Sequence, residues 1–409
     1  MSRLDELIAE LCPDGVEYEK FENVCKYIRG VTYKKTQEVN SEASNARKVL
    51  RANNITLSTN ELNFDDVKLI SRKVKVREDQ ILRKEDILIC AGSGSKEHIG
   101  KTAYISEDMD YTFGGFMAVI RCCKELDSRF FFHILTSELF SKHLRNTLNS
   151  STINNLNAEI MNNFRFPLPP LPVQQEIVRI LDNFTELTAE LTAELTARRK
   201  QYEYYRDLLL TMEDKPETKW MKLGEIADFR NGKGHEKAIA EDGKFIVVNS
   251  KFISTNGQVV KFTNQQISPL YIEDILIVMS DLPNGKALAK CFLVDENNRY
   301  TLNQRIGALR VKNKNIIDTK FLYYFLNRNR QLLKYDNGVD QTNLKKNEIL
   351  SVNIPIIPLK EQKRIVAILD HFDALCNDLT SGIPAEIEAR QKQYEYYRDK
   401  LLSFKEVTA

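Results

Sequence analysis

The sequence has 409 residues, of which 42% are hydrophobic and 28% are charged. Its 59 Lys and Arg residues against 57 Asp and Glu residues give a formal net charge of +2. This length suits two globular domains, each with its own core. The near-neutral balance excludes a uniformly basic nucleic-acid-binding surface, so any positive charge that binds phosphates is local or supplied by a partner.

Motifs for membranes, disulfides and metals are missing from the sequence. It has no run of about 18 apolar residues and no basic, apolar leader, so no association with a membrane is expected. The seven Cys form no CxxC pair, and the five His lack the spacing of a zinc site. We therefore expect a cytoplasmic protein with reduced thiols and no metal.

The chain begins with a predicted N-terminal helical segment, residues 1–15. Apolar residues recur on one side of residues 2–11, and Pro13, Asp14 and Gly15 then form a turn. A helix this short is not stable alone. We expect it to pack against the end of the C-terminal helix, YYRDKLLSF.

The first globular segment, residues 16–169, alternates short apolar strands with polar loops. Strands are predicted to begin near Val49, Asp86, Lys101 and Phe116, and a helix is predicted from Arg129. This order indicates an α+β domain.

Residues 91–102, AGSGSKEHIGKT, resemble a phosphate-binding loop. The spacing G-x-x-x-x-G-K-[ST] requires a glycine five residues before Gly100, and that position is Ser95. The loop also leads into a strand pattern instead of a helix whose N-terminus would hold a phosphate. A hairpin loop that reaches toward DNA is the preferred interpretation, and a nucleotide-binding enzyme is an alternative. Methyl-transfer and nuclease motifs are missing, so catalysis is not expected.

Polar and basic loops recur at matching places in both halves of the chain. Asn, Gln, Ser and Arg are side chains that read base edges, although each single loop also fits a solvated surface loop. The candidates in the first half are Arg29, Lys34, Lys35, Arg47, Arg51, Asn53, Ser93, Ser95, Lys96, Lys101, Ser151 and Thr152. Those in the second half are Arg230, Asn231, Lys233, His235, Asn249, Lys251, Asn284, Lys286, Gln341 and Thr342.

A long amphipathic helix is predicted in the central segment, residues 170–213. Counted over residues 173–212 it would be about 60 Å long, at ~1.5 Å per residue. It contains the tetrad TAEL twice, at residues 188–191 and 192–195. Four residues advance a helix by about 6 Å and turn it about 40° beyond a full turn, so one tetrad would shift the placement of the two domains by about one base pair.

The second globular segment, residues 214–357, repeats the order of the first. Strands are predicted from Phe245, Asp274 and Ile306, and a helix is predicted from Phe321. The loops differ between the two halves, which indicates two related domains with different targets.

The C-terminal segment, residues 358–409, repeats the central helix. The sequence QKQYEYYRDKLL at residues 391–402 shares ten of twelve positions with residues 199–210, and the Pro-rich starts of both copies also align. The starts are offset by 358 − 170 = 188 residues and the Tyr-rich ends by 394 − 202 = 192, so the second copy is four residues longer between them.

We expect these two helices to pack as an antiparallel coiled coil with pseudo-two-fold symmetry. Gly382 and Pro384 are expected to kink or split the second helix. The predicted packing and docking positions are Leu181, Phe184, Leu187, Leu191, Leu195, Tyr202, Tyr205, Leu369, Phe372, Leu379, Tyr394 and Tyr397.

The repeated LPxLxxQ and QYEYYRD helices, the TAEL run and the two variable α+β domains resemble the specificity subunits of type I restriction-modification systems, and the TAEL run resembles the IC class. The resemblance implies two target-recognition domains, each reading one half of a bipartite asymmetric site in double-stranded DNA. It implies helices that set the spacing and bind two methyltransferase subunits.

The resemblance further implies that this chain is non-catalytic and carries no cofactor. S-adenosylmethionine, ATP and Mg would serve the partner methyltransferase and restriction subunits. A helical scaffold or adaptor without sequence-specific DNA binding is a further alternative.

Overall fold

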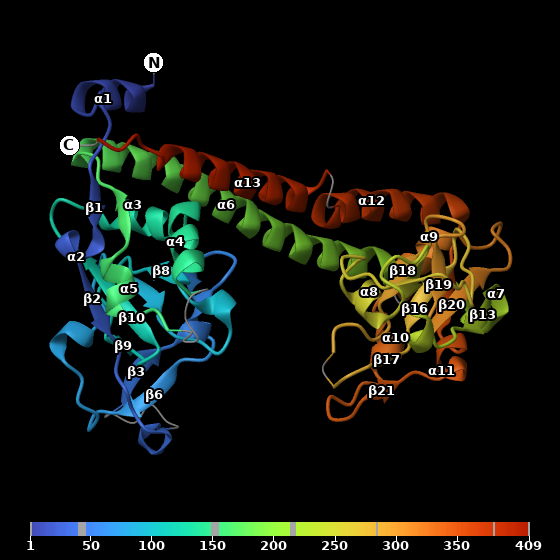
Figure 1. Ribbon diagram of the computed structural model, residues 1–409. Coiled ribbons are helices and arrows are strands. Elements are labelled where there is room, and N and C mark those ends of the chain that lie inside the picture. Colours follow the sequence, from blue (N-terminus) through green and yellow to red (C-terminus); the bar gives the residue numbers. More distant parts are fainter. Residues whose placement is uncertain are drawn as a thin grey trace. The chain divides into compact units, whose positions relative to one another are not determined.

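The computed structural model describes residues 2–39, 46–148, 155–212, 218–283, 285–378 and 381–407. It divides into two compact units, Met1–Thr192 with Glu386–Ala409, and Ala193–Ala385 (Figure 1). Each unit combines a globular part with portions of the long helices. The predicted α+β class is confirmed, and no helix among the described residues is long and apolar enough to span a membrane.

The globular part of the first unit contains sheets of strand order β2-β10-β7-β8, β6-β3-β9 and β1-β11, and the small pair β4-β5. The strands β3 and β9 are parallel, and the other pairs are antiparallel. The strands are β1 Tyr18–Lys20, β2 Cys25–Arg29, β3 Ala46–Leu50, β4 Ile55–Thr56, β5 Glu61–Leu62, β6 Lys68–Ser71, β7 Ile87–Cys90, β8 Thr102–Tyr104, β9 Tyr111–Phe113, β10 Met117–Cys122 and β11 Arg165–Pro167. The helices are α1 Arg3–Leu11, α2 Phe21–Val24, α3 Ser128–Leu135, α4 Glu138–Leu148 and α5 Ala158–Asn162.

The second unit repeats this arrangement with sheets of order β13-β20-β16-β18, β15-β14-β19 and β12-β22, and the pair β17-β21. The strands β14 and β19 are parallel, like their counterparts β3 and β9. The strands are β12 Lys219–Lys222, β13 Ala227–Asn231, β14 Phe245–Val248, β15 Phe262–Thr263, β16 Ile275–Val278, β17 Ser280–Asp281, β18 Cys291–Leu293, β19 Tyr300–Leu302, β20 Ile306–Val311, β21 Thr342–Asn343 and β22 Asn353–Ile356. The helices are α7 Leu223–Ile226, α8 Ser250–Ser254, α9 Thr319–Leu326, α10 Arg330–Leu333 and α11 Lys346–Leu350.

Three elements of the structure differ from their predicted form. The helix expected from Arg129 is divided into α3 and α4, and the helix expected from Phe321 is divided into α9 and α10. The second break contains Arg328 with φ of 57°, a left-handed conformation that ends a helix. The apolar stretch from Phe245 is a strand followed by α8, because the Asn249 side chain caps that helix by accepting a hydrogen bond from the Phe252 amide at 2.9 Å.

The long helices follow the repeat in the sequence. The first copy forms one continuous helix, α6 Leu171–Leu210. The second copy forms α12 Leu359–Asn377 and α13 Ile383–Leu401. The predicted split near Gly382 and Pro384 is confirmed, and Pro384 lies in the first turn of α13, where its missing N–H costs no helical hydrogen bond.

An aromatic stack joins the two copies of the repeat in each unit. In the first unit Phe184 of α6 stacks on Tyr397 of α13, with ring centroids 5.6 Å apart and planes 23° apart. In the second unit Phe372 of α12 stacks on Tyr205 of α6 at 5.7 Å and 24°. The two phenylalanines are equivalent in the repeat, and so are the two tyrosines. The helix contact is therefore the same in both units.

A half-buried carboxylate fixes the globular part of each unit to a long helix. In the first unit Asp182 of α6 accepts hydrogen bonds from Arg129 Nε at 2.9 Å and His133 Nε2 at 3.0 Å. In the second unit Asp370 of α12 accepts from Lys320 Nζ and the Tyr324 hydroxyl, both at 2.7 Å. We call these contacts the Asp182 clamp and the Asp370 clamp.

A buried glutamine beside each clamp completes the attachment. The Gln174 side chain accepts from the Asp127 amide at 2.8 Å and donates to the Pro169 carbonyl at 2.7 Å. Gln362 accepts from the Asp318 amide and donates to the Ile357 carbonyl, both at 2.7 Å. Each amide satisfies backbone groups where a globular helix meets a long helix.

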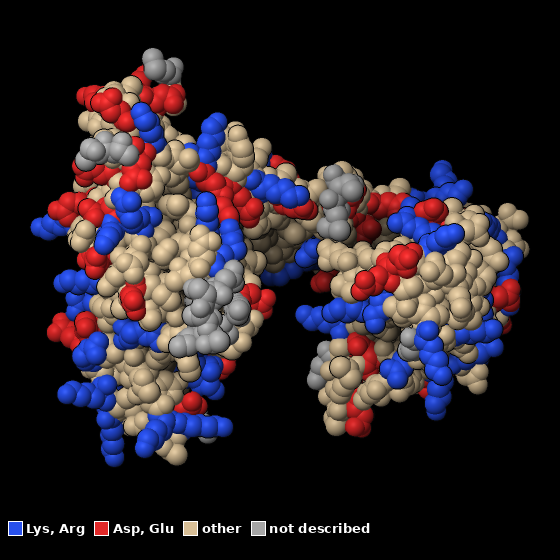
Figure 2. Space-filling view, viewed as in Figure 1, with Lys and Arg blue, Asp and Glu red and all other residues tan. Residues whose placement is uncertain are grey.

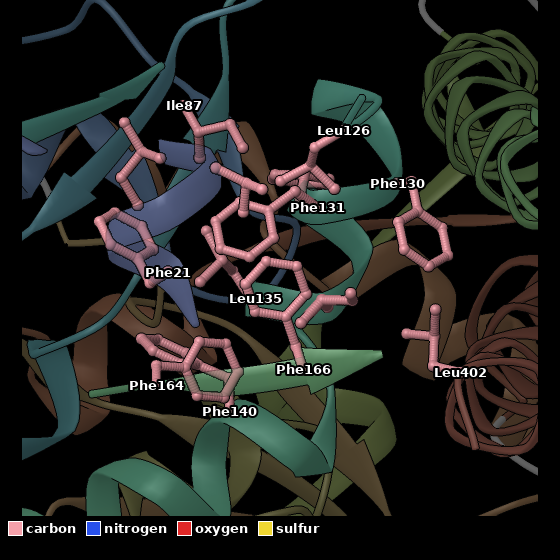
Figure 3. Close-up of a cluster of buried hydrophobic side chains, with 14 of the residues drawn as sticks. Phe21, Ile87, Leu126, Phe130, Phe131, Leu135, Phe140, Phe164, Phe166 and Leu402 are labelled. Carbon is pink, nitrogen blue, oxygen red and sulfur yellow. The ribbon is translucent and has the colours of Figure 1, made fainter. Parts of the chain in front are cut away.

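The core of the first unit lies between α3, the β1-β11 pair and the helices (Figure 3). Phe131 packs against Phe166 with ring centroids 4.7 Å apart and against Phe21 at 5.9 Å. Phe130, its neighbour on α3, lies on the other side with Leu402 of the C-terminal segment (Figure 3). The predicted N-terminal helix is confirmed as α1, and Leu4 buries its side chain in the same cluster.

The Asp182 clamp predicts an acid-sensitive first unit. Burial lowers the pKa of His133 and outweighs the effect of the hydrogen bond that His133 donates to Asp182. In the folded chain His133 therefore binds a proton less readily than in the unfolded chain. Stability is therefore complete above about pH 6.5 and falls as the pH drops below that value. Burial alone would raise the pKa of Asp182, but the His133 hydrogen bond and the Arg129 charge lower it, which adds a loss at still lower pH.

We expect His133→Gln to lower the stability of the first unit by about 1–3 kcal/mol at neutral pH. The variant should also lose the decline in stability that begins below about pH 6.5. Hydrogen exchange of the α3 amides, corrected for the intrinsic effect of pH, measures both effects. His371→Gln, at an exposed histidine, is the matched control. An equal pH dependence in wild type and His133→Gln would contradict this assignment.

Candidate nucleic-acid interface

Four loops of the first unit surround a cavity of about 880 Å³, which we call the loop hollow. They follow β2, follow β3, connect β7 to β8, and connect β9 to β10. The lining residues are Val31, Thr32, Tyr33, Arg51, Ala52, Asn53, Gly92, Ser93, Gly94, His98, Lys101, Gly114, Gly115, Phe116 and Met117. Most of the wall is apolar, which is typical of a binding cavity with few polar groups.

Two residues at the end of β2 hold the wall of the hollow together. The Arg29 guanidinium donates to the Gly115 carbonyl at 2.9 Å and to the Leu156 carbonyl at 3.2 Å. A Cβ added at Gly30 would lie 2.1 Å from the Gly114 oxygen, so glycine allows the close approach of the β9-β10 turn. Arg29, a predicted DNA contact, therefore positions this turn.

The structure brings together four of the predicted residues, Arg51, Asn53, Ser93 and Lys101, in the wall of the hollow. Arg51 Nη2 and Asn53 Nδ2 donate to the same Asp66 oxygen at 2.7 and 3.1 Å. This exposed carboxylate orders the loop after β3.

Three side-chain nitrogen atoms of the hollow have no hydrogen-bond partner among the described residues, although Arg51 Nη2 is paired with Asp66. Arg51 Nε and His98 Nδ1 are buried without a hydrogen bond among the described residues. Lys101 is only 9% exposed, and its ammonium makes no hydrogen bond or ion pair with the part of the chain that is described. Burial lowers the pKa of Lys101.

A basic edge lies beside the hollow, at the end of the unit where β3 and β6 are found (Figures 1 and 2). It combines the predicted Lys34 and Lys35 with exposed residues after β6 that were not predicted, namely Arg72, Lys73, Lys75 and Arg77. Val74, between them, is packed with Tyr33, which places the two loops side by side. This local charge suits a phosphate backbone in a chain that is nearly neutral overall.

The second unit gathers predicted residues at the equivalent edge. The backbone of Lys233 forms an isolated β-bridge with Asn303 in the β19-β20 turn. The Gln341 side chain donates a hydrogen bond to Ser280 Oγ at 2.7 Å. The tip of this turn is Arg305, which is exposed, has φ of 67° and takes the place of Phe116 in the first unit. Phe116 is itself 74% exposed.

Four predicted residues of the second unit make internal contacts. Arg230 donates to the buried Asp274 at 2.8 Å, and His235 is buried with ring nitrogens 2.7 Å from the Lys233 carbonyl and 2.9 Å from Thr301 Oγ1. Asn249 caps α8, and Thr342 is buried in β21. These side chains support the loops and are not available as free donors.

The remaining predicted residues lie on the surface or outside the described residues. Those at least partly exposed are Arg47, Ser95, Asn231, Lys251 and Lys286. Ser151, Thr152, Asn284 and Leu379 lie outside the described residues, and so does the side chain of Lys96.

The predicted helix positions differ in burial. Leu181 and Leu369 are fully buried, and the Phe184, Tyr202, Tyr205, Phe372, Tyr394 and Tyr397 rings all lie in aromatic contacts. Leu191 and Leu195 are half-buried, and Leu187 is 47% exposed.

The loop at residues 91–102 contains a three-residue helical turn, Lys96–His98, and then enters β8. No helix N-terminus follows Lys101, so the geometry of a phosphate-binding loop is not formed in this described segment. No group of three His, Cys, Asp or Glu residues that would hold a metal occurs among the described residues.

Sequence reasoning missed Phe116, His98, Arg305 and the basic residues after β6. The run RKVKVR at residues 72–77 was a readable signal, because basic residues interrupted by valines mark an exposed strand edge. Phe116 and His98 gave no signal, since their place in the hollow depends on loops distant in sequence.

The chain thus has two domains of one fold, each attached to the repeated long helices and each with polar loops at equivalent positions. The model of the type I restriction modification DNA specificity domain matches residues 13–198 and 216–389, so the chain belongs to this family. It is thus a specificity subunit of the type I restriction-modification kind, a non-catalytic DNA target-recognition subunit.

Relatives and solved structures agree with this assignment. The specificity subunit of the type I restriction enzyme EcoR124I/EcoR124II of Escherichia coli is 38% identical over 58% of this chain, and the match spans 61% of that subunit. A putative type I specificity subunit of Haemophilus influenzae is 32% identical over 75% of this chain and 84% of its own length.

The fold is similar to a solved chain from work on complex assembly and conformational transition of the type I R-M system. Its TM-score is 0.58 with 17% identity, covering 95% of this chain and 98% of that one. The S subunit of a type I system from M. genitalium gives a TM-score of 0.52 with 16% identity, covering 97% and 98%.

The basic edge predicts how DNA affinity depends on salt. Removing Lys73 and Lys75 together by substitution to Met should lower the slope of log affinity against log salt by about two, one for each phosphate contact. Titration of labelled duplex DNA with the full-length chain at several salt concentrations measures the slope.

Arg230→Met is the contrasting variant, because Asp274 already holds that guanidinium. It should leave the salt slope unchanged and destabilise the second unit by about 1–3 kcal/mol. An unchanged slope in the double lysine variant would remove the basic edge from the interface.

Proposed function

We propose that the chain recognises a bipartite asymmetric DNA sequence, with residues 16–169 reading one half and residues 214–357 reading the other. The helices at residues 170–213 and 358–409, with the N-terminal segment 1–15, hold the two readers and set the gap between the half-sites. The observation that supports this most directly is that the two globular domains share one fold but carry different side chains at equivalent loop tips.

The β9-β10 and β19-β20 turns illustrate this difference. Phe116 offers an apolar face, which suits a thymine methyl group or the edge of a base. Arg305 offers an exposed guanidinium without a hydrogen bond or ion pair to the described residues, which suits the two acceptors of guanine. The two domains therefore prefer different sequences.

The surfaces of the long helices support two equal docking sites for a methyltransferase subunit. Tyr204 is 65% exposed and lies edge-on to Tyr205 at 5.4 Å, and Tyr396 is 61% exposed and lies edge-on to Tyr397 at 5.3 Å. Each unit thus presents the same exposed aromatic pair, and exposed tyrosines are frequent anchors in interfaces. Two copies of one partner fit this duplication.

The remaining roles belong to a cytoplasmic complex with these partners. Two methyltransferase subunits would use S-adenosylmethionine, and restriction subunits would use ATP and Mg. The TAEL run resembles the IC class, and we propose that the number of tetrads sets the gap.

Exchange of one domain tests the proposal. Residues 16–169 are replaced by the corresponding domain of another specificity subunit, and methylated bases are mapped by single-molecule sequencing in a host that carries the complete system. We expect one half of the recognised sequence to change and the other half and the gap to stay the same. A change in both halves would reject modular reading.

Deletion of residues 192–195 tests the role of the tetrads. The helix loses about 6 Å and rotates by about 40° beyond a full turn, so the gap should shorten by about one base pair. Both half-sites should keep their sequence, because the deleted residues lie outside both globular parts. Mapped methylation sites with an unaltered gap would show that the helix is not the ruler.

A further inference from the structure

Lys101 of the loop hollow has an equivalent in the second unit, Lys290, and the two differ in their hydrogen bonds. Lys101 and Lys290 are equivalent, because the Cys90 amide donates to the Lys101 carbonyl at 2.8 Å as the Val278 amide donates to the Lys290 carbonyl at 3.0 Å. Lys290 Nζ donates to the Ser254 carbonyl at 3.1 Å and to Asn256 Oδ1 at 2.7 Å. Lys101 has no such acceptor among the described residues.

The cause lies in the loop after the parallel strand. In the second unit this loop forms α8, and its end supplies both acceptors for Lys290. In the first unit the corresponding loop forms β4 and β5. The ammonium of Lys101 therefore faces the hollow with no internal acceptor, and such burial is costly unless a ligand supplies one.

The other polar atoms of the hollow indicate the charge of that ligand. Arg51 Nε and His98 Nδ1 are also buried without partners, and no Asp or Glu lies among the lining residues that are described. Arg51 already has a counter-charge in Asp66, and His98 Nε2 lies 3.7 Å from Glu97, but the Lys101 ammonium has none among the described residues. An ammonium without a counter-charge favours an anionic ligand. The lining also contains apolar residues, among them Val31, Met117 and the exposed Phe116.

Two glycines keep the hollow open. A Cβ added at Gly94 would have no atom within 4 Å, and one added at Gly114 would meet its nearest atom at 3.7 Å. Backbone packing thus does not require glycine at either position. The missing side chains leave room for a ligand of several rings, since cavities for such ligands measure about 300–1,000 Å³.

We propose that the loop hollow of the first unit binds a nucleotide, with its phosphate on Lys101 and Arg51 and its base against Phe116. The nucleotide is either one unit of the bound DNA, turned out of the duplex, or a free nucleotide. In the first case the inference deepens the proposed DNA reading and rests on it; in the second it is independent. Stacking of a base on an aromatic ring tolerates any sequence, so this site adds affinity more than selectivity.

The test uses the full-length chain with dAMP, deoxyadenosine and duplex DNA of mixed sequence as probes. Calorimetry should show that dAMP binds more tightly than deoxyadenosine. Lys101→Met should weaken dAMP binding about tenfold and remove the difference between the two probes. Gly94→Leu places a side chain in the hollow and should weaken the binding of both probes, and Phe116→Ala should weaken both about tenfold.

Two control variants separate this role from a structural one. Lys101→Met should leave the melting temperature unchanged or raise it, because it removes a buried charge without a partner. Lys290→Met should lower it, because that ammonium has two acceptors in the fold. Lys84→Met, at an exposed lysine outside the hollow, should change neither binding nor stability. A lower melting temperature in Lys101→Met would indicate an internal partner and overturn the proposal.

The duplex distinguishes the two sources of the nucleotide. If duplex DNA competes with dAMP and binds less tightly to Lys101→Met, the nucleotide belongs to DNA. If dAMP binds and the duplex does not compete, the ligand is a free nucleotide. If neither probe responds to Lys101→Met or Gly94→Leu, the inference is wrong. Its failure is distinct from that of the proposed function, because domain exchange would still change one half of the methylated sequence.

Discussion

The attachment of each globular part depends on one carboxylate at the same place in the repeat. Asp182 and Asp370 occupy equivalent helical positions, and both accept two hydrogen bonds from the first turns of a globular helix. The donors differ, Arg and His in one unit and Lys and Tyr in the other. A half-buried carboxylate needs hydrogen-bond donors, but guanidinium, imidazole, ammonium and hydroxyl groups all serve. The globular domain can therefore differ in sequence and still be attached to its helix. The loops differ between the two domains, but both domains are attached at equivalent positions of the helical repeat.

The two aromatic stacks lie on either side of the TAEL tetrads. Each stack pairs the start of one repeat copy with the Tyr-rich end of the other. Along α6, Phe184 and Tyr205 are 205 − 184 = 21 residues apart, and in the second copy Phe372 and Tyr397 are 397 − 372 = 25 residues apart. The TAEL tetrads lie between Phe184 and Tyr205, outside both stacks. Adding or removing a tetrad therefore leaves the residues of both stacks unchanged.

The architecture could be predicted from the sequence because the two halves of the chain repeat the same motifs. The offset of 188 residues, the Tyr-rich repeat and the Gly-Pro pair predicted two α+β domains, paired helices and the break between α12 and α13. The roles of single polar residues were not predictable in this way. Arg29 binds the Leu156 carbonyl and His235 meets Thr301, and both contacts join segments far apart in the chain. Residue type alone does not distinguish a cation that holds a loop from one that faces a ligand.

The equivalent lysines show how a repeated scaffold acquires different sites. The backbone around Lys101 and Lys290 is the same, so the difference arises from the neighbouring loop. A helix at that loop supplies acceptors and makes the lysine part of the fold. A hairpin supplies none and leaves the same lysine at the wall of a hollow. The change needs no alteration of the sheets, the clamp or the helices. The net charge of +2 therefore does not determine whether such a lysine is paired within the fold. The geometry of the neighbouring loop determines it.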